Sequence, residues 1–495
     1  MAIELPPPLP PQVVAMTELR TEAAGTVLEY KTYRIHLPPG GSLDARAIRR
    51  AIAGAVGISE LVSALAQAYY ADGQLSTQLL YAVDGDELYL ALYPRKIVGI
   101  DAPDSLRPYF APLVGEPLTD RALESRRALA NVDAERAGIA AQAWLEPVAG
   151  GADLQIVPDG RKLPTNSASA EFGNPGNRFV GRHFLDLDLR HSTRGGDRFK
   201  LLWDTALTGI SDGRADDYND ESLSWDRATT SGVWGVKAHA FDYAGPHGRD
   251  GQLREGELTW LLPVAASLRS RMLLDARVGY INRKIDDGTT TLREEYPSMQ
   301  IGLHYAYSAS PAPGPLDIDI GTTFRKGLRS DTAATGAELD YFLWRPTVSV
   351  NLALGDRWST GMLLTGQLSS DVLPLESQWV LGGIDNIAAY LPGVAVGDIG
   401  GYGELDLQYH GWELLGVRVT PRAFVEYGLS RYERQADEAT RGTAMLADVG
   451  AELVANWRFL EASVTVAAPI AHRRVSSAVR DDSDANLLFR VSAAF

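Results

Sequence analysis

From about Pro164 to its last residue, the sequence consists of segments in which apolar and polar side chains alternate. The alternation is clearest in residues 185–190, 274–280, 299–305, 316–320 and 404–409. Successive side chains of a β-strand point to opposite faces, so each segment predicts a strand with one apolar and one polar face. The long C-terminal part of the chain is therefore predicted to be all-β.

Two kinds of protein have strands of this pattern. In a soluble β-sandwich or propeller the apolar face forms the core, whereas in a membrane barrel it faces lipid. Aromatic residues near the segment ends favour the barrel, because interfacial girdles place them there; they are Trp203, Trp234, Tyr280, Tyr307, Trp344, Trp358 and Trp457. Backbone N–H and C=O groups in lipid must all be paired, which requires the sheet to close on itself as a barrel. We predict that residues 164–495 form an all-β transmembrane barrel of about 16 antiparallel strands.

The last segment, "LLFRVSAAF", alternates up to a terminal phenylalanine, Phe495. Outer-membrane barrels present such a strand to their assembly machinery, so Phe495 is predicted to be an assembly signal. The expected surroundings are outer-membrane lipid and lipopolysaccharide. The long polar segments 211–222, 242–256 and 437–443 are predicted to be loops on the outer side. Acidic residues at 216–221 in the first could hold Ca²⁺, although a solvated loop explains them as well.

Composition excludes several classes of protein. The chain has 495 residues, 47 basic and 63 acidic, and a net charge of −16, which argues against binding nucleic acid. It has no cysteine, which fits an envelope protein without disulfides. No apolar run reaches the length of a transmembrane helix. The start resembles a mature N-terminus behind a start codon, so we expect a signal peptide that is absent from this sequence.

The N-terminal part predicts a different organisation. Residues 1–26 are proline-rich, with a short helix expected at 13–24, and are interpreted as a tether; a ligand for a partner's groove is the alternative. Residues 27–99 and 100–163 each predict the order β-α-α-β-β. This order, with "AYYADGQLSTQLL" at 68–80, resembles POTRA domains, the periplasmic modules of outer-membrane transporters. The predicted fold is thus α+β periplasmic POTRA domains followed by the barrel.

One long apolar loop follows a strand and a pair of adjacent glycines. Leu381-Gly382-Gly383, Tyr390, Gly397-Asp398 and Glu404 match the pattern L-G-G-x-x-S-V-R-G-[FY], then Gly-Asp, then a strand with glutamate. Further on, "PRAFVEYG" (421–428) is similar to the strand motif F-x-D-x-G. Together with the two modules, these motifs resemble the two-partner secretion transporters (TpsB, the haemolysin secretion and activation proteins), members of the POTRA-plus-barrel superfamily.

The resemblance implies that the loop 382–401 folds into the barrel lumen, where an arginine of the loop meets an aspartate of the wall. This chain departs from the pattern: Ala388 stands for the arginine, Ala389 for the glycine after it and Glu426 for the aspartate. We expect Glu426 to pair with Arg422 instead and the loop still to enter the lumen; an ordinary surface loop is the alternative. The residues assigned roles are, in the loop, Leu381, Gly382, Gly383, Asn386, Ile387, Ala388, Ala389, Tyr390, Gly397 and Asp398, and on the wall Arg418, Arg422, Phe424, Glu426 and Gly428.

The family implies a monomeric outer-membrane transporter that passes an unfolded partner protein to the cell surface. Its POTRA domains, in the periplasm, would capture the partner by strand addition. A channel for polysaccharide or small solutes and an insertase for outer-membrane proteins remain alternatives. No nucleotide, zinc-protease or other enzyme motif is convincing, because the one G-x-S-x-G match, 209–213, precedes an acidic loop. We expect no cofactor and no metal site.

Overall fold

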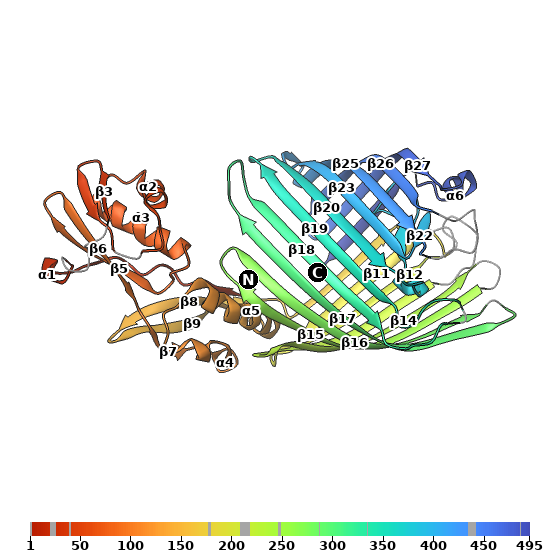
Figure 1. Ribbon diagram of the computed structural model, residues 1–495, viewed down its shortest axis with the longest axis horizontal. Coiled ribbons are helices and arrows are strands. Elements are labelled where there is room, and N and C mark those ends of the chain that lie inside the picture. Colours follow the sequence, from red (N-terminus) through yellow and green to blue (C-terminus); the bar gives the residue numbers. More distant parts are fainter. Residues whose placement is uncertain are drawn as a thin grey trace.

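A computed structural model shows two small α/β units beside one end of a large β-barrel (Figure 1). It describes residues 2–19, 26–38, 41–176, 180–207, 218–245, 249–286, 288–333, 335–433, 442–485 and 487–495. The G-x-S-x-G match lies outside these residues, as do Asp216 and Asp217 of the acidic segment and most of the loop 437–443. Among the described helices, none is both long and apolar enough to cross a membrane.

The predicted barrel is confirmed, because its strands form one closed antiparallel sheet. The strands are β10 (Asn166–Gly173), β11 (Phe184–Ser192), β12 (Asp197–Ala206), β13 (Tyr218–Thr229), β14 (Gly232–Gly245), β15 (Arg249–Ala266), β16 (Ser270–Asp286), β17 (Thr291–Ala309), β18 (Leu316–Gly327), β19 (Phe342–Leu354), β20 (Trp358–Ser369), β23 (Ile399–Tyr409), β24 (Trp412–Leu414), β25 (Val417–Arg431), β26 (Ala444–Trp457), β27 (Leu460–Arg473) and β28 (Leu488–Ala494). The short β24 continues the line of β23 along β25, so the two count as one interrupted strand and the barrel has 16 strands.

The alternation predicted from the sequence separates the two faces of this sheet. In β25, Val425 and Tyr427 are 41% and 45% exposed, whereas Phe424, Glu426 and Gly428 between them are buried. The exposed face of the barrel is apolar and the buried face carries the charged groups. A soluble sandwich would show the reverse, so the outer surface is of the kind that contacts lipid.

The first unit has a five-stranded sheet, ordered β2-β5-β6-β4-β3, with two helices packed on it. Its own elements are β3 (Val27–Tyr30), β4 (Tyr33–His36), α2 (Ala45–Ile52), α3 (Ile58–Ala71), β5 (Thr77–Asp84) and β6 (Glu87–Pro94). Asp44 begins α2 by accepting a hydrogen bond from the Ala47 N–H, as an N-cap should. Ile48 and Ile52 of α2 then pack against Leu61 and Leu65 of α3.

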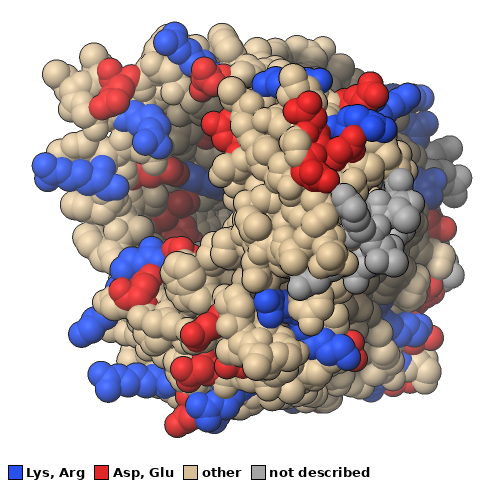
Figure 2. All heavy atoms as spheres, turned by 90° about the vertical axis from the view of Figure 1, so that its left-hand side faces the viewer, with Lys and Arg blue, Asp and Glu red and all other residues tan. Residues whose placement is uncertain are grey.

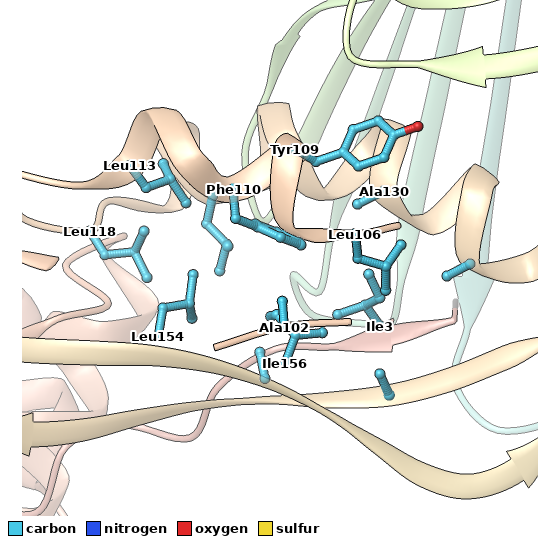
Figure 3. Close-up of a cluster of buried hydrophobic side chains, with 14 of the residues drawn as sticks. Ile3, Ala102, Leu106, Tyr109, Phe110, Leu113, Leu118, Ala130, Leu154 and Ile156 are labelled. Atoms are coloured by element: carbon cyan, nitrogen blue, oxygen red, sulfur yellow. The ribbon is translucent and has the colours of Figure 1, made fainter. Parts of the chain in front are cut away.

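The second unit has a four-stranded sheet, ordered β1-β8-β9-β7. Its own elements are β7 (Ile97–Asp101), α4 (Arg107–Phe110), the 3₁₀ turn η1 (Ala111–Leu113), α5 (Asp120–Ala137), β8 (Ile139–Val148) and β9 (Gly151–Lys162). Thr119 caps the start of α5, and Gly138 ends it with a left-handed φ of 74°. Phe110, Leu123 and Leu154 are fully buried in the core, which Figure 3 shows in close-up.

The proline-rich start is not a free tether, which corrects the prediction for residues 1–26. β1 (Ile3–Glu4) adds a parallel strand to β8 of the second unit, and β2 (Gln12–Val13) adds one to β5 of the first. Ile3 is fully buried in the core of the second unit (Figure 3). Of the helix predicted at 13–24, the described part shows Val13 in β2 and a helix α1 at Met16–Leu19, and residues 20–24 of the prediction lie outside the described residues.

Helix α5 fixes the second unit to the rim of the barrel. Arg136, near its end, forms an ion pair with Asp226 of β13 and donates a hydrogen bond of 3.0 Å to the Gly196 carbonyl. Ala228 and Val233 of the barrel belong to the same buried cluster as the core of the second unit. The two parts thus share one apolar core at this rim. Figure 2, which faces this end, shows basic and acidic side chains interspersed over the surface.

Candidate functional site: the loop inside the barrel

The candidate site is built on residues 370–398, which connect β20 to β23 and are called here the lid loop. A short hairpin, β21 (Trp379–Leu381) and β22 (Ala395–Gly397), divides it into a stem and a tip. The diglycine begins the tip, with φ of 99° at Gly382 and 110° at Gly383. A Cβ at Gly382 would lie 2.2 Å from the Leu391 carbonyl oxygen, so only glycine allows this close turn.

Hydrogen bonds within the tip fix its shape. Asn386 accepts from the Gly382 N–H at 2.8 Å and donates to the Val380 carbonyl at 3.2 Å. The Gly383 N–H donates to the Tyr390 carbonyl at 2.7 Å, which closes the tip on itself. Asn386 replaces the serine of the family pattern and bridges the turn at this position.

The tip is packed against the inner face of the barrel wall. Ile387, Ala389 and Tyr390 are at most 2% exposed and form one cluster with Tyr402 of β23 and Leu446 of β26. The tip is therefore not a free surface loop, because it packs on the buried face of these strands, as the predicted position in the lumen requires.

Gly428 supplies room for this contact. A Cβ there would lie 2.9 Å from a methyl carbon of Leu381 and 3.0 Å from Ile387, so a side chain at 428 would push the lid loop off the wall. The glycine of the wall motif is thus explained by the closeness of the tip.

Two buried carboxylates hold the tip by its backbone. Glu426 accepts a hydrogen bond from the Ala388 N–H at 2.7 Å, and Asp448 of β26 accepts one from the Ala389 N–H at 2.7 Å. The Tyr402 hydroxyl donates to the other oxygen of Glu426. Glu426 is 2% and Asp448 0% exposed. Where the family pattern has an arginine side chain, this chain presents two successive main-chain N–H groups.

The sequence did not identify Asp448. It stands directly opposite Glu426 in the neighbouring strand, and both face inward. Alternation places Asp448 on the same face as Glu452, so the register of β25 against β26 is the signal that could have found it.

The predicted pairing of Glu426 with Arg422 is wrong. Arg422 forms ion pairs with Glu404 and, at 3.2 Å, with Glu452, and its guanidinium lies 5.0 Å from the Phe424 ring centre. Glu426 is instead committed to the tip. Alternation put Arg422 on the correct face but could not choose among several carboxylates there. Arg418 is exposed near the opposite end of β25, away from the tip.

Gly397 and Asp398 close the lid loop at its other end. Asp398 is fully buried and accepts hydrogen bonds of 2.9 Å from both the Leu373 and the Glu433 N–H groups. It thereby ties the start of the lid loop to the connection after β25. A Cβ at Gly397 would lie 2.5 Å from the Arg431 carbonyl oxygen, so the backbones run closely side by side.

A second connection, between β27 and β28, covers the tip and was not foreseen from the sequence. It contains α6 (Ser477–Asp482). The Leu391 N–H donates to the Ser483 carbonyl at 2.6 Å, and the Ala485 N–H donates to the Ala389 carbonyl at 3.0 Å. The tip is thus enclosed between the wall and this connection. Among the described residues, no cluster of His, Asp or Glu could hold a metal ion.

Phe495 lies where the barrel closes. β10 pairs with β28 from Ser169 opposite Ala494 to Gly173 opposite Arg490. Beyond β28, the Phe495 N–H donates to the Ala168 carbonyl at 2.8 Å, and its ring is tilted against the Phe459 ring with the ring centres 5.2 Å apart. The side chain itself is 72% exposed on the outside of the barrel.

Comparison of the sequence with family models and with curated proteins finds no match. Solved structures do match. CdiB from Escherichia coli has a TM-score of 0.68 at 16% identity over 99% of this chain and 94% of that chain. CdiB from Acinetobacter baumannii has a TM-score of 0.65 at 12% identity over 97% and 96%. BamA from Haemophilus ducreyi, in a structure lacking POTRA domains 1–3, has a TM-score of 0.51 at 12% identity over 91% and 98%. The chain therefore has the fold that its motifs indicated, a 16-stranded barrel preceded by POTRA-like units, and shares it with CdiB over nearly its whole length.

Proposed function

We propose that this chain is an outer-membrane transporter that captures a partner polypeptide through its periplasmic N-terminal units and passes it, unfolded, through the barrel to the cell surface. The observation that carries the proposal is the pairing of an extended segment with an edge strand of each unit. β8 accepts Ile3–Glu4 and β5 accepts Gln12–Val13, both in parallel register. An incoming polypeptide can use the same backbone groups.

Contacts beyond the two short ladders support recognition of an extended chain. Tyr70 donates a hydrogen bond to the Pro6 carbonyl, and Gln78 donates one of 3.2 Å to the Pro10 carbonyl. Gln142 donates to the Leu5 carbonyl at 2.6 Å. These side chains bind the main chain of the segment, which is how a groove accepts an extended polypeptide with little demand on its sequence.

The lid loop supports a gated pore rather than a constitutive channel. Deleting residues 385–397 removes the tip and should turn a small, flickering conductance in planar bilayers into a large, steady one. A deletion that still inserts as a folded barrel and conducts like the full chain would contradict the proposal and favour a channel for small solutes or a scaffold.

Strand capture has its own test. A chain lacking residues 2–14 should bind a labelled synthetic peptide of residues 2–14, measured by fluorescence anisotropy, because both edges are then free. The full chain is the control and should bind it far more weakly. A peptide with Ile3→Asp should also bind weakly, since Ile3 is buried in the second unit. Equal binding by the two proteins would refute capture at these edges.

One observation favours the insertase alternative. The seam between β10 and β28 has five residue pairs, extended by the bonds between Ala168 and Phe495, and β27 and β28 share six, whereas β10 and β11 share eight and β16 and β17 share 17. A short seam is the expected opening point for delivering a strand into the membrane. Joining the seam with a disulfide between Ala170→Cys and Ala493→Cys, which face each other, should abolish insertion but leave export through the lumen intact.

A further inference from the structure

The stem of the lid loop makes a second set of contacts, on a different part of the wall from the tip. It contains the 3₁₀ turn η2 (Leu375–Ser377). Around the barrel, the tip contacts β25 and β26. The stem reaches β17 and β16, which lie three and four strands before β20 in the opposite direction. The lid loop thus spans the lumen and is fixed on both sides.

Glu376 is the centre of the stem contacts. Its carboxylate accepts a hydrogen bond of 2.9 Å from Arg283 of β16 and another from the Tyr296 hydroxyl of β17. The side chain of Arg283 is 8% exposed, and Tyr296 is fully buried. A guanidinium buried this deeply in the wall needs a carboxylate partner. Glu376 provides one from the lid loop, which is the element that moves in the proposed gate.

The connection between β18 and β19, residues 328–341, joins the same group. Thr335 donates a hydrogen bond to Glu294, which lies 3.7 Å from Arg283. The Glu338 N–H donates to the Val372 carbonyl at 2.8 Å, so this connection and the stem are paired directly. Arg283 therefore contacts the lid loop directly and is linked to the second connection through Glu294.

The next residue of the stem is held as well. The Ser377 carbonyl accepts hydrogen bonds from Arg345 at 3.0 Å and from Gln367 at 2.9 Å. Its hydroxyl donates to Tyr341, which packs edge-on against Tyr296. The stem is thus held at 376 and 377, separately from the contacts that the tip makes with β25 and β26.

We propose that Arg283 and Tyr296 are positioning residues that grip Glu376 and form the latch of the lid loop, and that release of Glu376 is the step that lets the tip leave the wall. The latch rests on the proposed function, in which opening of the lid loop precedes passage of the partner. The ion pair that holds the lid loop is then the one at the stem, because the arginine of the family pattern is absent from the tip.

A thiol-labelling experiment tests the latch without any partner polypeptide. The chain has no cysteine, so Ala389→Cys introduces a single thiol at a fully buried position of the tip. In the otherwise unchanged protein, reconstituted in liposomes, this thiol should react slowly with a bulky water-soluble maleimide. Adding Glu376→Gln, which keeps the size of the side chain but removes its charge, should raise the rate by about tenfold or more, because a charged hydrogen bond is lost.

Arg277→Gln is the matched control. Arg277 lies on the same strand and the same face as Arg283 and also pairs with a carboxylate, Asp275, but is 43% exposed and does not contact the lid loop. This variant should label at the unmodified rate, and Arg283→Lys, which keeps the cation, should label more slowly than Arg283→Gln. If Glu376→Gln yields no folded barrel, Tyr296→Phe removes one of the two groups that grip Glu376 and should raise the rate in the same direction.

A folded Glu376→Gln protein that labels at the unmodified rate would overturn the latch, and so would an equal increase in Arg277→Gln. Either result would leave the transporter proposal standing, since that proposal depends on the conductance of the 385–397 deletion. Conversely, Glu376→Gln could be found to raise the labelling rate while deletion of 385–397 leaves the conductance unchanged. That pair of results would support the latch and refute the gated pore.

Discussion

At the scale of single residues, the tip of the lid loop is held through its main chain. A backbone N–H is present at every position except proline, so the bonds from residues 388 and 389 to Glu426 and Asp448 do not depend on the side chain at 388. The small side chains of Ala388 and Ala389 let the backbone come close to the wall. The contact therefore depends on the two wall carboxylates, Glu426 and Asp448, and not on the side chains of the tip.

Replacing Glu426 by alanine should open the pore more often. The Ala388 N–H would lose its acceptor in a buried place, which costs about 1–3 kcal/mol of the closed state, whereas the Tyr402 hydroxyl keeps Glu404 as an acceptor. Single-channel recordings should show a higher open probability. Asp406→Ala removes another inward carboxylate of the same wall that does not contact the tip and should have little effect; similar openings in both variants would contradict this account.

Gly428→Val tests the packing of the tip. The added side chain would overlap Leu381 and Ile387, and such overpacking costs about 1–3 kcal/mol. We expect larger or longer openings with an unchanged barrel. Gly401→Ala is the control, since its added Cβ would have its nearest neighbour, a carbon of Leu429, at 3.6 Å, an ordinary contact. Unchanged conductance of a folded Gly428→Val protein would argue against contact at this position.

At the scale of elements, α5 connects the second unit to the barrel. Arg136→Ala would remove the buried partner of Asp226, which keeps only its 3.3 Å contact with Arg198, and would remove the hydrogen bond to the Gly196 carbonyl, at a cost of about 1–3 kcal/mol. The unit should become more susceptible to limited proteolysis in the full chain. The adjacent Arg227, 54% exposed and 3.9 Å from Asp197, offers the control: Arg227→Ala should cost less than about 1 kcal/mol. Equal susceptibility of both variants would show that the apolar contacts alone fix the unit.

The same helix predicts a pH dependence. Burial raises the pKa of Asp133, against the opposing effects of a hydrogen bond from Tyr109 and the charge of Arg136. A carboxyl whose folded pKa is raised contributes stability below its unfolded pKa of about 3.9, and this contribution is lost as the pH rises through the folded value. The free energy of unfolding of the N-terminal units in urea should therefore fall as the pH rises through the folded pKa of Asp133. Asp133→Asn should remove this fall. An identical pH profile for the variant would contradict it.

At the scale of the whole molecule, the barrel was predictable because alternation is a local pattern repeated along the chain, and the lid loop because its glycines and apolar residues lie in one stretch. Pairing between distant residues was not predictable. β1 and β2 are two residues long within a proline-rich stretch, and only contact with β8 and β5 makes them strands. Asp448 and Glu376 likewise gain their roles from register and from the closure of the barrel.

Closure by β10 and β28 also determines the order in which the molecule can be made. The two strands are separated by more than 300 residues, so β10 cannot find its last partner until the C-terminus has been delivered. Until then one edge of β10 is an unpaired template for aggregation. Non-local pairing of this kind is slow to form. We therefore expect the nascent barrel to need a factor that shields the free edge of β10 until β28 arrives to pair with it.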